Sequence, residues 1–249
     1  MRYLTKEWYN LSQNTWLDFE LRAHKGAYQK DEDLYQKLRK KRERSFIKRI
    51  YKYYDNIPQG IIEVYGFSRK RFDIKRCKSL FYEEEKRKQS DAINSLPREI
   101  SSQIADIRLY ALGYCTREVL SQVRSLSEKN KRKVNEILAN YSRVQEEEKI
   151  PKDLRENIIF HDGQVVDCKF SRDLVIHLIE CPGHRSNNKI TFQDVKIIKK
   201  EKTIRGSYWI YEELYIIEDG YEVHILFRCE NFQEVHELTL SCKDIIIGG

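Results

Sequence analysis

The sequence predicts an α+β protein, with a basic helical domain over residues 1–150 followed by an antiparallel β-rich domain over residues 151–249. Apolar residues recur at helical spacing before Pro151 and alternate with polar residues after it. The charge balance changes sign at the same place, because residues 1–150 hold 33 Lys and Arg against 22 Asp and Glu, and residues 151–249 hold 13 against 17. Five of the six histidines and four of the six cysteines also follow Pro151. Changes that coincide in this way indicate a domain boundary.

Helical segments account for most of the first domain, and Ile61–Tyr65 fits either a short turn of helix or extended chain. The spacing of apolar residues and the capping residues place them over residues 3–23, 31–54, 68–89, 97–113 and 116–148. In the first segment, the large aromatics Trp8, Trp16 and Phe19 are expected to dock the start of the chain onto a core. In the last segment, the all-polar stretch Ser127–Lys133 is compatible with a break between two antiparallel helices.

Short strands separated by turn residues account for the second domain. The alternation places about seven of them, over residues 165–170, 174–181, 190–198, 207–217, 221–228, 235–242 and 245–247. The clearest hairpin joins the fourth and fifth of these through Glu218-Asp219-Gly220. This pattern predicts a sandwich, a partly open barrel or a strongly curved sheet.

The composition indicates a cytoplasmic protein. Apolar residues make up 40% of the 249 residues and charged residues 34%, a balance that still permits packed cores. No apolar run approaches the roughly 18–20 residues of a membrane span, and the first residues lack the apolar core of a signal peptide. The six cysteines form no CxxC pair, which favours free thiols in a reducing compartment.

The strongest physical signal is a run of cations, since residues 37–52 carry nine Lys and Arg against the single acid Glu43. A basic helix attracts phosphate backbones by releasing counterions. The same charges suit an acidic protein partner, or the acidic β domain of the same chain. The candidate contact residues for nucleic acid or a protein partner are Lys40, Arg42, Lys48, Arg49, Arg69 and Arg71.

A second candidate site lies in the β domain, where a carboxylate stands among aromatic residues. Strand alternation puts Glu212 and Glu213 on opposite faces, and puts Glu213 on the face of Trp209, Tyr211 and Tyr215. The residues Trp209, Tyr211 and Glu213 therefore form a candidate ligand pocket. The alternative, which we favour, is that Glu213 has a structural role such as a salt bridge to a lysine of the helical domain.

Motifs for metal, nucleophilic or phosphate chemistry are missing from the sequence. Cys181-Pro182-Gly183-His184 offers one pair of metal ligands, but structural zinc needs two such pairs. Alternation predicts that His224 faces solvent or a satisfied polar contact. There is no GxSxG and no GxxxxGK[ST], although a Cys–His pair can still meet in space. We expect no cofactor and no metal.

Five short segments resemble a known protein family. They are Arg2–Tyr9, Ile104–Gly113, Phe160–Gly163, Trp209–Glu213 and Glu237–Leu240. Together they resemble an uncharacterised family of Gram-positive bacterial proteins, domain of unknown function 4085, over residues 1 to about 247, with residues 24–90 matching least. The resemblance implies a cytoplasmic bacterial protein and carries no activity. The β half is also similar in character to small sheet domains of bacterial immunity-type proteins, an analogy of fold alone.

The sequence therefore favours a non-enzymatic cytoplasmic binding or interaction protein with a protein partner, of an immunity- or stress-related type. The alternative is a nucleic-acid-binding protein that uses the basic helices around residues 37–78. A third hypothesis is an enzyme that uses Glu213 or a Cys–His pair.

Overall fold

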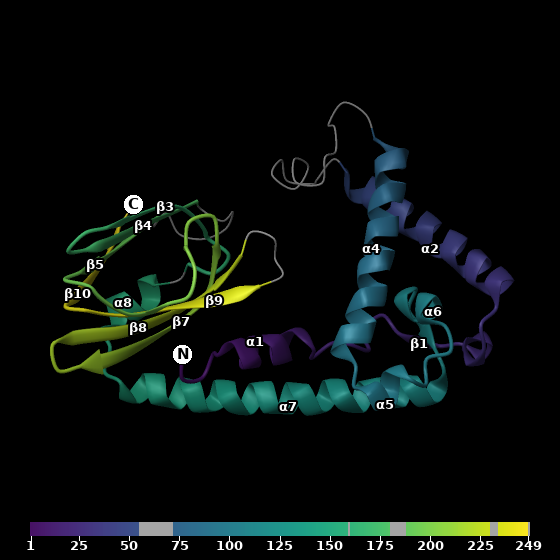
Figure 1. Ribbon diagram of the computed structural model, residues 1–249, viewed down its shortest axis with the longest axis horizontal. Helices are drawn as coiled ribbons and strands as arrows, with labels where there is room; N and C mark the ends of the chain where they lie inside the picture. The colour runs from purple at the N-terminus through teal and green to yellow at the C-terminus, as the bar shows by residue number, and fades with distance from the viewer. Residues whose placement is uncertain (55–71, 159, 180–187, 230–233, 249) are drawn as a thin grey trace. The chain divides into compact units, whose positions relative to one another are not determined.

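The computed structural model describes residues 1–54, 72–158, 160–179, 188–229 and 234–248 (Figure 1). A helical N-terminal half precedes an eight-stranded antiparallel sheet, so the predicted α+β class is confirmed. The chain forms two compact units: the β unit consists of Met1–Gln13 and Asn130–Gly249, and the helical unit of Asn14–Lys129. Pro151 marks the change from long helices to strands along the chain, whereas the β unit also takes in the first thirteen residues.

The helices begin where the sequence supplies caps. Asp31 accepts a hydrogen bond from the N–H of Leu34 at 2.9 Å, and Asp73 accepts one from the N–H of Arg76 at 3.0 Å. Such caps satisfy N–H groups that have no partner inside the helix. The helices are α1 (Lys6–Gln13), α2 (Glu32–Tyr53), α4 (Ile74–Ser95), α5 (Arg98–Ser101), α6 (Ile107–Ala111), α7 (Arg117–Glu147) and α8 (Lys152–Asn157), with a 3-10 turn at Lys25–Tyr28.

The break considered within the last long helix is wrong, because α7 runs unbroken for 31 residues. The polar stretch Ser127–Lys133 contains no Gly or Pro that would interrupt a helix. Ser127 is also buried, although it is polar. The helix buries Val123 in the core of the helical unit and Val134 in that of the β unit.

The large aromatics near the start of the chain behave differently from one another. Trp8 is buried, and its indole N–H donates to the carbonyl oxygen of Val134. Trp16 and Phe19 are 63% and 78% exposed. The prediction that these aromatics dock the start of the chain is therefore confirmed for Trp8 and wrong for Trp16 and Phe19.

The helical unit contains two apolar clusters. Leu21, Ala92, Tyr110 and Val119 belong to one of them. Tyr35, Leu38, Phe81, Leu109 and Leu112 form the other, between α2, α4 and α6. A short parallel pair, β1 (Arg22–Ala23) with β2 (Tyr114–Cys115), joins two segments that lie far apart in the sequence.

The sheet of the β unit has the order β10-β5-β4-β3-β7-β8-β9-β6. The strands are β3 (Gln164–Phe170), β4 (Leu174–Ile179), β5 (Lys189–Gln193), β6 (Lys196–Lys200), β7 (Tyr208–Ile217), β8 (Gly220–Arg228), β9 (Val235–Cys242) and β10 (Asp244–Gly248). The sheet curves but does not close, and its two halves enclose one core (Figure 1). Ile176, Phe192, Trp209, Ile225 and Leu240 are fully buried in this core.

The strand predicted over residues 190–198 is in fact two strands. β5 pairs with β4 and β10, whereas β6 pairs with β9 at the other edge of the sheet. Asp194 separates them in a left-handed conformation, with φ of 54°. Its N–H donates to Asp173 at 2.9 Å and its carboxylate pairs with Arg172 at 3.1 Å. These local hydrogen bonds stabilise a turn that alternation of apolar residues does not show.

The predicted hairpin is confirmed as β7 and β8. Gly220 has φ of +130°, and a Cβ atom there would lie 2.2 Å from the carbonyl oxygen of Cys242. Only glycine suits this position, because it combines positive φ with a close approach of backbone. None of the helices that the structure describes is both long and apolar enough to cross a membrane.

Candidate functional site

The outer face of α2 carries a row of cations, which we call the lysine row. Its members are all exposed. Counted from Lys37, the other four follow after three, four, seven and eleven residues, which places all five on one side of the helix. None of them forms an ion pair within the part of the chain that the structure describes. The lysine row consists of Lys37, Lys40, Lys41, Arg44 and Lys48.

The inner side of the same helix carries Arg42 and Arg49, which line a hollow of about 210 Å³ together with side chains of α4 and the end of α6. The structure therefore divides four of the predicted contact residues into two pairs. Lys40 and Lys48 belong to the lysine row, and Arg42 and Arg49 to this hollow, which we call the arginine pocket. Arg69 and Arg71 lie outside the described residues.

The carboxylates of the arginine pocket are bound by other groups. Glu85 is buried and accepts hydrogen bonds from Arg39 at 2.8 Å and from the Tyr35 hydroxyl at 2.5 Å. Burial, together with the Glu85 carboxylate, raises the pKa of Tyr35 to about 12. Lys88 lies 2.5 Å from Glu20 and 3.0 Å from Glu84.

Arg42 and Arg49 are thus left with no carboxylate within ion-pair distance among the described residues. They still influence the pocket, since the hydrogen bond from Lys88 lowers the pKa of Glu20 and the charges of the two arginines lower it further. The pocket therefore holds two guanidinium groups that have no ion-pair partner among the described residues, alongside three acids that are paired by other cations.

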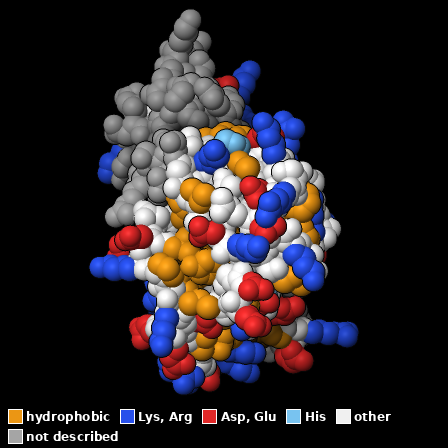
Figure 2. Space-filling model, turned by 90° about the vertical axis from the view of Figure 1, so that its left-hand side faces the viewer, with side chains coloured by type: hydrophobic (Ala, Val, Ile, Leu, Met, Phe, Trp, Pro, Cys, Tyr) orange, Lys and Arg blue, Asp and Glu red, His pale blue; other side chains and the backbone are white. Residues whose placement is uncertain are grey.

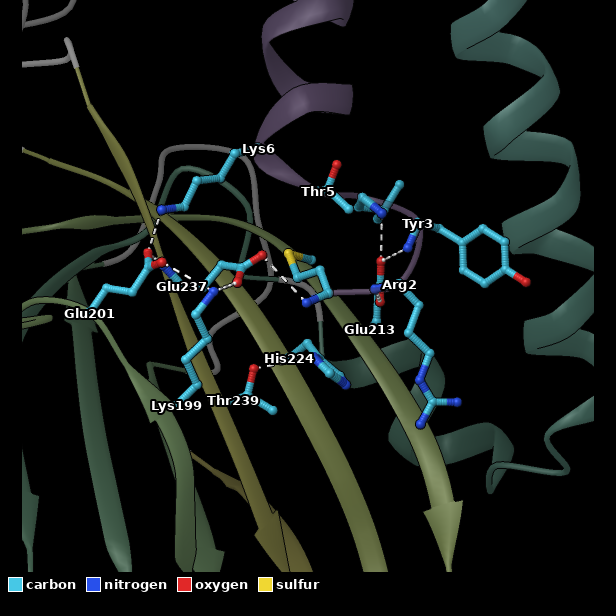
Figure 3. A network of polar contacts seen from close by, with 12 residues as sticks. Arg2, Tyr3, Thr5, Lys6, Lys199, Glu201, Glu213, His224, Glu237 and Thr239 are labelled. Carbon is cyan, nitrogen blue, oxygen red and sulfur yellow. Dashed lines mark hydrogen bonds and ion pairs between the residues drawn. The ribbon is translucent and has the colours of Figure 1, made fainter.

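In the β unit, Glu213 holds the first residues of the chain (Figure 3). The backbone N–H groups of Arg2, Tyr3 and Leu4 donate to its carboxylate at 2.7, 2.9 and 2.5 Å. The Tyr215 hydroxyl donates to the same carboxylate at 3.0 Å, and the side chain of Glu213 is fully buried. This buried carboxylate is satisfied by the protein itself, as a buried charge must be. The arrangement supports a structural role, through hydrogen bonds to the backbone rather than a salt bridge to lysine.

A second cluster of charges lies beside Glu213 on the same face of the sheet (Figure 3). Lys199 lies 2.5 Å from Glu237 and 3.1 Å from Glu201, and Lys6 pairs with Glu201. The amino group of Met1 lies 3.4 Å from Glu237. Burial alone would raise the pKa of Glu201, but hydrogen bonds from Lys6, the Glu237 N–H and Lys199 lower it to about 2. These pairs fasten α1 to the sheet.

The candidate pocket of Trp209, Tyr211 and Glu213 does not share one face. A β-bulge between Trp209 and Tyr211 shifts the alternation by one residue. Trp209 therefore packs in the core enclosed by the sheet, whereas Tyr211 packs against Trp8 at 5.1 Å on the other face, where Glu213 lies. The predicted shared face is wrong for Trp209.

The bulge also places Glu212 on the side of Trp209. The Trp209 indole N–H donates to Glu212 at 2.7 Å. Burial raises the pKa of Glu212 to about 7, and this hydrogen bond opposes the rise. The sequence did not distinguish Glu212, rather than Glu213, as the carboxyl that lies beside Trp209.

The histidine of β8, His224, has structural partners among the described residues. His224 is buried between Glu222 at 2.8 Å and Thr239 at 3.2 Å, which confirms the predicted satisfied polar contact. Burial lowers the pKa of His224. Across the described ranges, no three His, Cys, Asp or Glu side chains gather around a possible metal position. The Cys181–His184 pair lies outside those ranges.

Charges of both signs mix on the face of the molecule in Figure 2, with a group of hydrophobic side chains among them. That face shows no field of a single sign. By their charge, the lysine row and the arginines of the arginine pocket both favour an anion.

These features define an α+β protein of two compact units. The family described as "Protein of unknown function (DUF4085)" matches residues 27–237, so the chain belongs to this family, as the sequence motifs predict. No curated protein and no solved structure matches the chain.

Sequence reasoning missed how remote segments meet. Glu213 lies more than 200 positions from the backbone groups it binds. The arginine pocket takes Glu20, Lys88 and Leu112 from three separate segments. Only the cationic run on α2 carried a signal in the sequence, and helical periodicity could have separated its two faces.

Proposed function

We propose that the protein is a cytoplasmic binding protein that recognises an acidic segment of a partner protein through the lysine row. The observation that supports this is a set of five exposed cations on one face of α2, none of which forms an ion pair with the residues that the structure describes. The cytoplasmic assignment is supported by the five described cysteines, which are all free thiols.

The spacing of the lysine row favours a protein partner. Residues 37 to 48 span eleven steps of about 1.5 Å, so the row is roughly 16 Å long. Carboxylates at every third or fourth position of a facing helix would repeat at the same interval. Four of the five cations are lysines, which act as point charges and lack the fixed fork with which arginine binds phosphate.

Nucleic acid is the second candidate, and the same row favours it by charge alone. If all five cations contacted phosphates, the logarithm of affinity for a duplex would fall with the logarithm of salt concentration with a slope of about −4.5. This steep dependence distinguishes the two candidates.

The test uses defined probes and the full chain. Binding of a 20-residue glutamate-rich helical peptide, and of a mixed-sequence duplex of 20 base pairs, is measured by fluorescence anisotropy at about 50 and 150 mM salt. We expect the peptide to bind and the Lys40→Glu/Lys48→Glu variant to weaken that binding about tenfold, because two attractions become repulsions. The matched control is Lys129→Glu/Arg132→Glu, which makes the same change of charge at exposed positions of α7.

Two results contradict the proposal. If the duplex binds with the steep slope and the peptide does not bind, nucleic acid replaces the protein partner. If neither probe binds at about 50 mM salt, or if the α7 control weakens binding as much as the α2 variant, the lysine row is not a recognition surface.

A further inference from the structure

The arginine pocket contains a buried donor with no acceptor. The Nε–H group of Arg42 is buried and has no hydrogen-bond partner among the described residues. A buried donor left without a partner destabilises the folded protein. An acceptor atom supplied by a bound molecule would remove this deficit.

The cations in and beside the pocket outnumber its acids by one, since Lys88, Arg39, Arg42 and Arg49 stand against Glu20, Glu84 and Glu85. The three acids form their ion pairs with Lys88 and Arg39, so Arg42 and Arg49 have no carboxylate within ion-pair distance among the described residues. The two arginines lie two helical turns apart on one side of α2. Guanidinium groups donate pairs of hydrogen bonds to carboxylate or phosphate oxygens, so the unpaired pair suits an anionic group.

Aromatic rings contact these guanidinium groups, and Phe46 and Phe81 also line the pocket. The carbon of the Arg49 guanidinium lies 5.6 Å from the ring centre of Phe46, and that of Arg42 lies 5.0 Å from the ring centre of Tyr114. Phe46 itself packs against Phe81 with ring centres 5.6 Å apart. A ligand that reaches the arginines therefore meets flat apolar surfaces as well as charge.

The backbone beside Arg42 is shaped to admit its side chain. Gly113 has φ of +86°, and a Cβ atom there would lie 2.7 Å from the Nη2 atom of Arg42 and 2.7 Å from the carbonyl oxygen of Glu20. Any other residue would displace the guanidinium or strain the turn. Glycine at this position thus keeps Arg42 in the pocket.

A second hollow of about 340 Å³ adjoins the first, and both are lined by Glu20, Lys88 and Ala111. Its wall includes the exposed aromatics Trp16 and Phe19, whose ring centres are 6.5 Å apart. Its volume alone falls in the range of about 300–1,000 Å³ that is usual for small-molecule sites. The two hollows together offer an end that can bind an anion, at the arginines, and an apolar end, at Trp16 and Phe19.

We infer that the arginine pocket and the adjoining hollow bind a small organic anion, a carboxylate or a phosphate ester that carries a flat apolar group. The anionic group accepts hydrogen bonds from Arg42 and Arg49, and the apolar group packs on the phenylalanines and towards Trp16. This site lies on the opposite side of α2 from the lysine row and goes beyond the proposed function.

The test compares four probes by isothermal titration calorimetry with the full chain. Phenyl phosphate and phenylacetate combine both features, inorganic phosphate has only the charge, and benzyl alcohol has only the ring. We expect at least one of the two aromatic anions to bind about tenfold or more tightly than inorganic phosphate, and benzyl alcohol to show no binding. The preference between phenyl phosphate and phenylacetate identifies the anionic group.

Variants assign the binding to the pocket. Arg42→Gln/Arg49→Gln should weaken binding of the better aromatic anion about tenfold or more, and Arg42→Lys/Arg49→Lys should restore part of it. The control Lys40→Gln/Lys48→Gln removes the same charge from the lysine row and should leave binding unchanged. If thermal melting shows that the double glutamine variant is unfolded, the single variant Arg49→Gln is used in its place, because Arg49 is exposed and its replacement should not disturb the fold.

Three results overturn the inference. They are equal affinity for inorganic phosphate and the aromatic anions, wild-type affinity in the folded glutamine variant, and an equal loss in the lysine-row control. Because the glutamate-rich peptide depends on Lys40 and Lys48 and the aromatic anions on Arg42 and Arg49, failure of one proposal leaves the other standing.

Discussion

Replacing Glu213 with glutamine should release the start of the chain from the sheet. The Oε2 atom accepts from the N–H of Arg2 and the hydroxyl of Tyr215, and Oε1 accepts from the N–H groups of Tyr3 and Leu4. An amide NH₂ in place of Oε2 would face the Arg2 N–H donor to donor, whereas the Tyr215 hydroxyl can turn to accept. The part-buried N–H of Arg2 would then be unpaired, and the two remaining backbone hydrogen bonds, from Tyr3 and Leu4, would lose their charge assistance.

The size of the effect follows from these bonds. An unpaired buried donor contributes about 1–3 kcal/mol of destabilisation, and loss of charge assistance roughly halves each of two bonds. The free energy that holds residues 2–4 on the sheet should fall by about 2–4 kcal/mol. A change of 2 kcal/mol corresponds to about a 30-fold change in the local opening equilibrium.

Hydrogen exchange measures this opening directly. In the Glu213→Gln variant, the amides of Arg2, Tyr3 and Leu4 should exchange about 30-fold faster or more. The matched control is Glu218→Gln, since Glu218 is exposed in the hairpin turn of the same strand pair and should change stability by less than about 0.5 kcal/mol. Exchange of those three amides within about threefold of the wild-type rate would refute the account of Glu213.

Three further predictions concern the β unit. The pKa of Glu212 rises to about 7 on folding, so its contribution to stability is complete below about pH 4 and is lost as the pH rises through 7. In urea titrations, the free energy of unfolding of Glu212→Gln should therefore rise relative to that of the wild type between about pH 5 and 7, by at most about 1.4 kcal/mol per pH unit. A difference that stays constant over this range would contradict the assignment. The pKa of Glu201 falls to about 2 on folding, so its contribution to stability is present above about pH 4 and is lost as the pH falls through 2. In the same titrations, the free energy of unfolding of Glu201→Gln should therefore fall less steeply than that of the wild type as the pH is lowered from about 4 to 2. An unchanged pH dependence would count against the role of this charge cluster. Gly220→Ala should destabilise the β unit by about 2 kcal/mol or more in thermal melts, whereas Gly248→Ala, where a Cβ meets nothing within 4 Å, should have little effect; equal effects would contradict the steric argument.

The features that the sequence predicted well are local ones. α2 begins at the predicted acidic cap, and the hairpin of β7 and β8 turns at the predicted glycine. Each depends on residues within a few positions of one another, where capping and turn chemistry act. The satisfied environment of His224 followed from alternation alone.

Predictions failed where a single residue changes the geometry of a strand. Asp194 divides one predicted strand into two that lie at opposite parts of the sheet, and the bulge before Tyr211 moves Trp209 to the other face. Each of these changes shifts an alternation of period two, which makes every later residue change side. The sequence carried no turn signal strong enough to show either one.

The candidate sites were predictable only in part. The cationic run identified α2, because charge is visible in the sequence, but its division into the lysine row and the arginine pocket depends on α4 and α6 packing on one side. The partners of Glu213 could not be predicted, because residues more than 200 positions apart in the sequence form no local pattern that would indicate their contact.

The lysine row and the arginine pocket, the two proposed recognition sites, both lie in the helical unit. The most direct measurement is to add phenyl phosphate to the full chain labelled with ¹⁵N and to follow the amide resonances. We predict shifts within Asn14–Lys129, centred on Arg42, Arg49 and Gly113, with the rest of the chain unchanged. Shifts confined to the β unit, around Tyr211 and Glu213, would contradict the account.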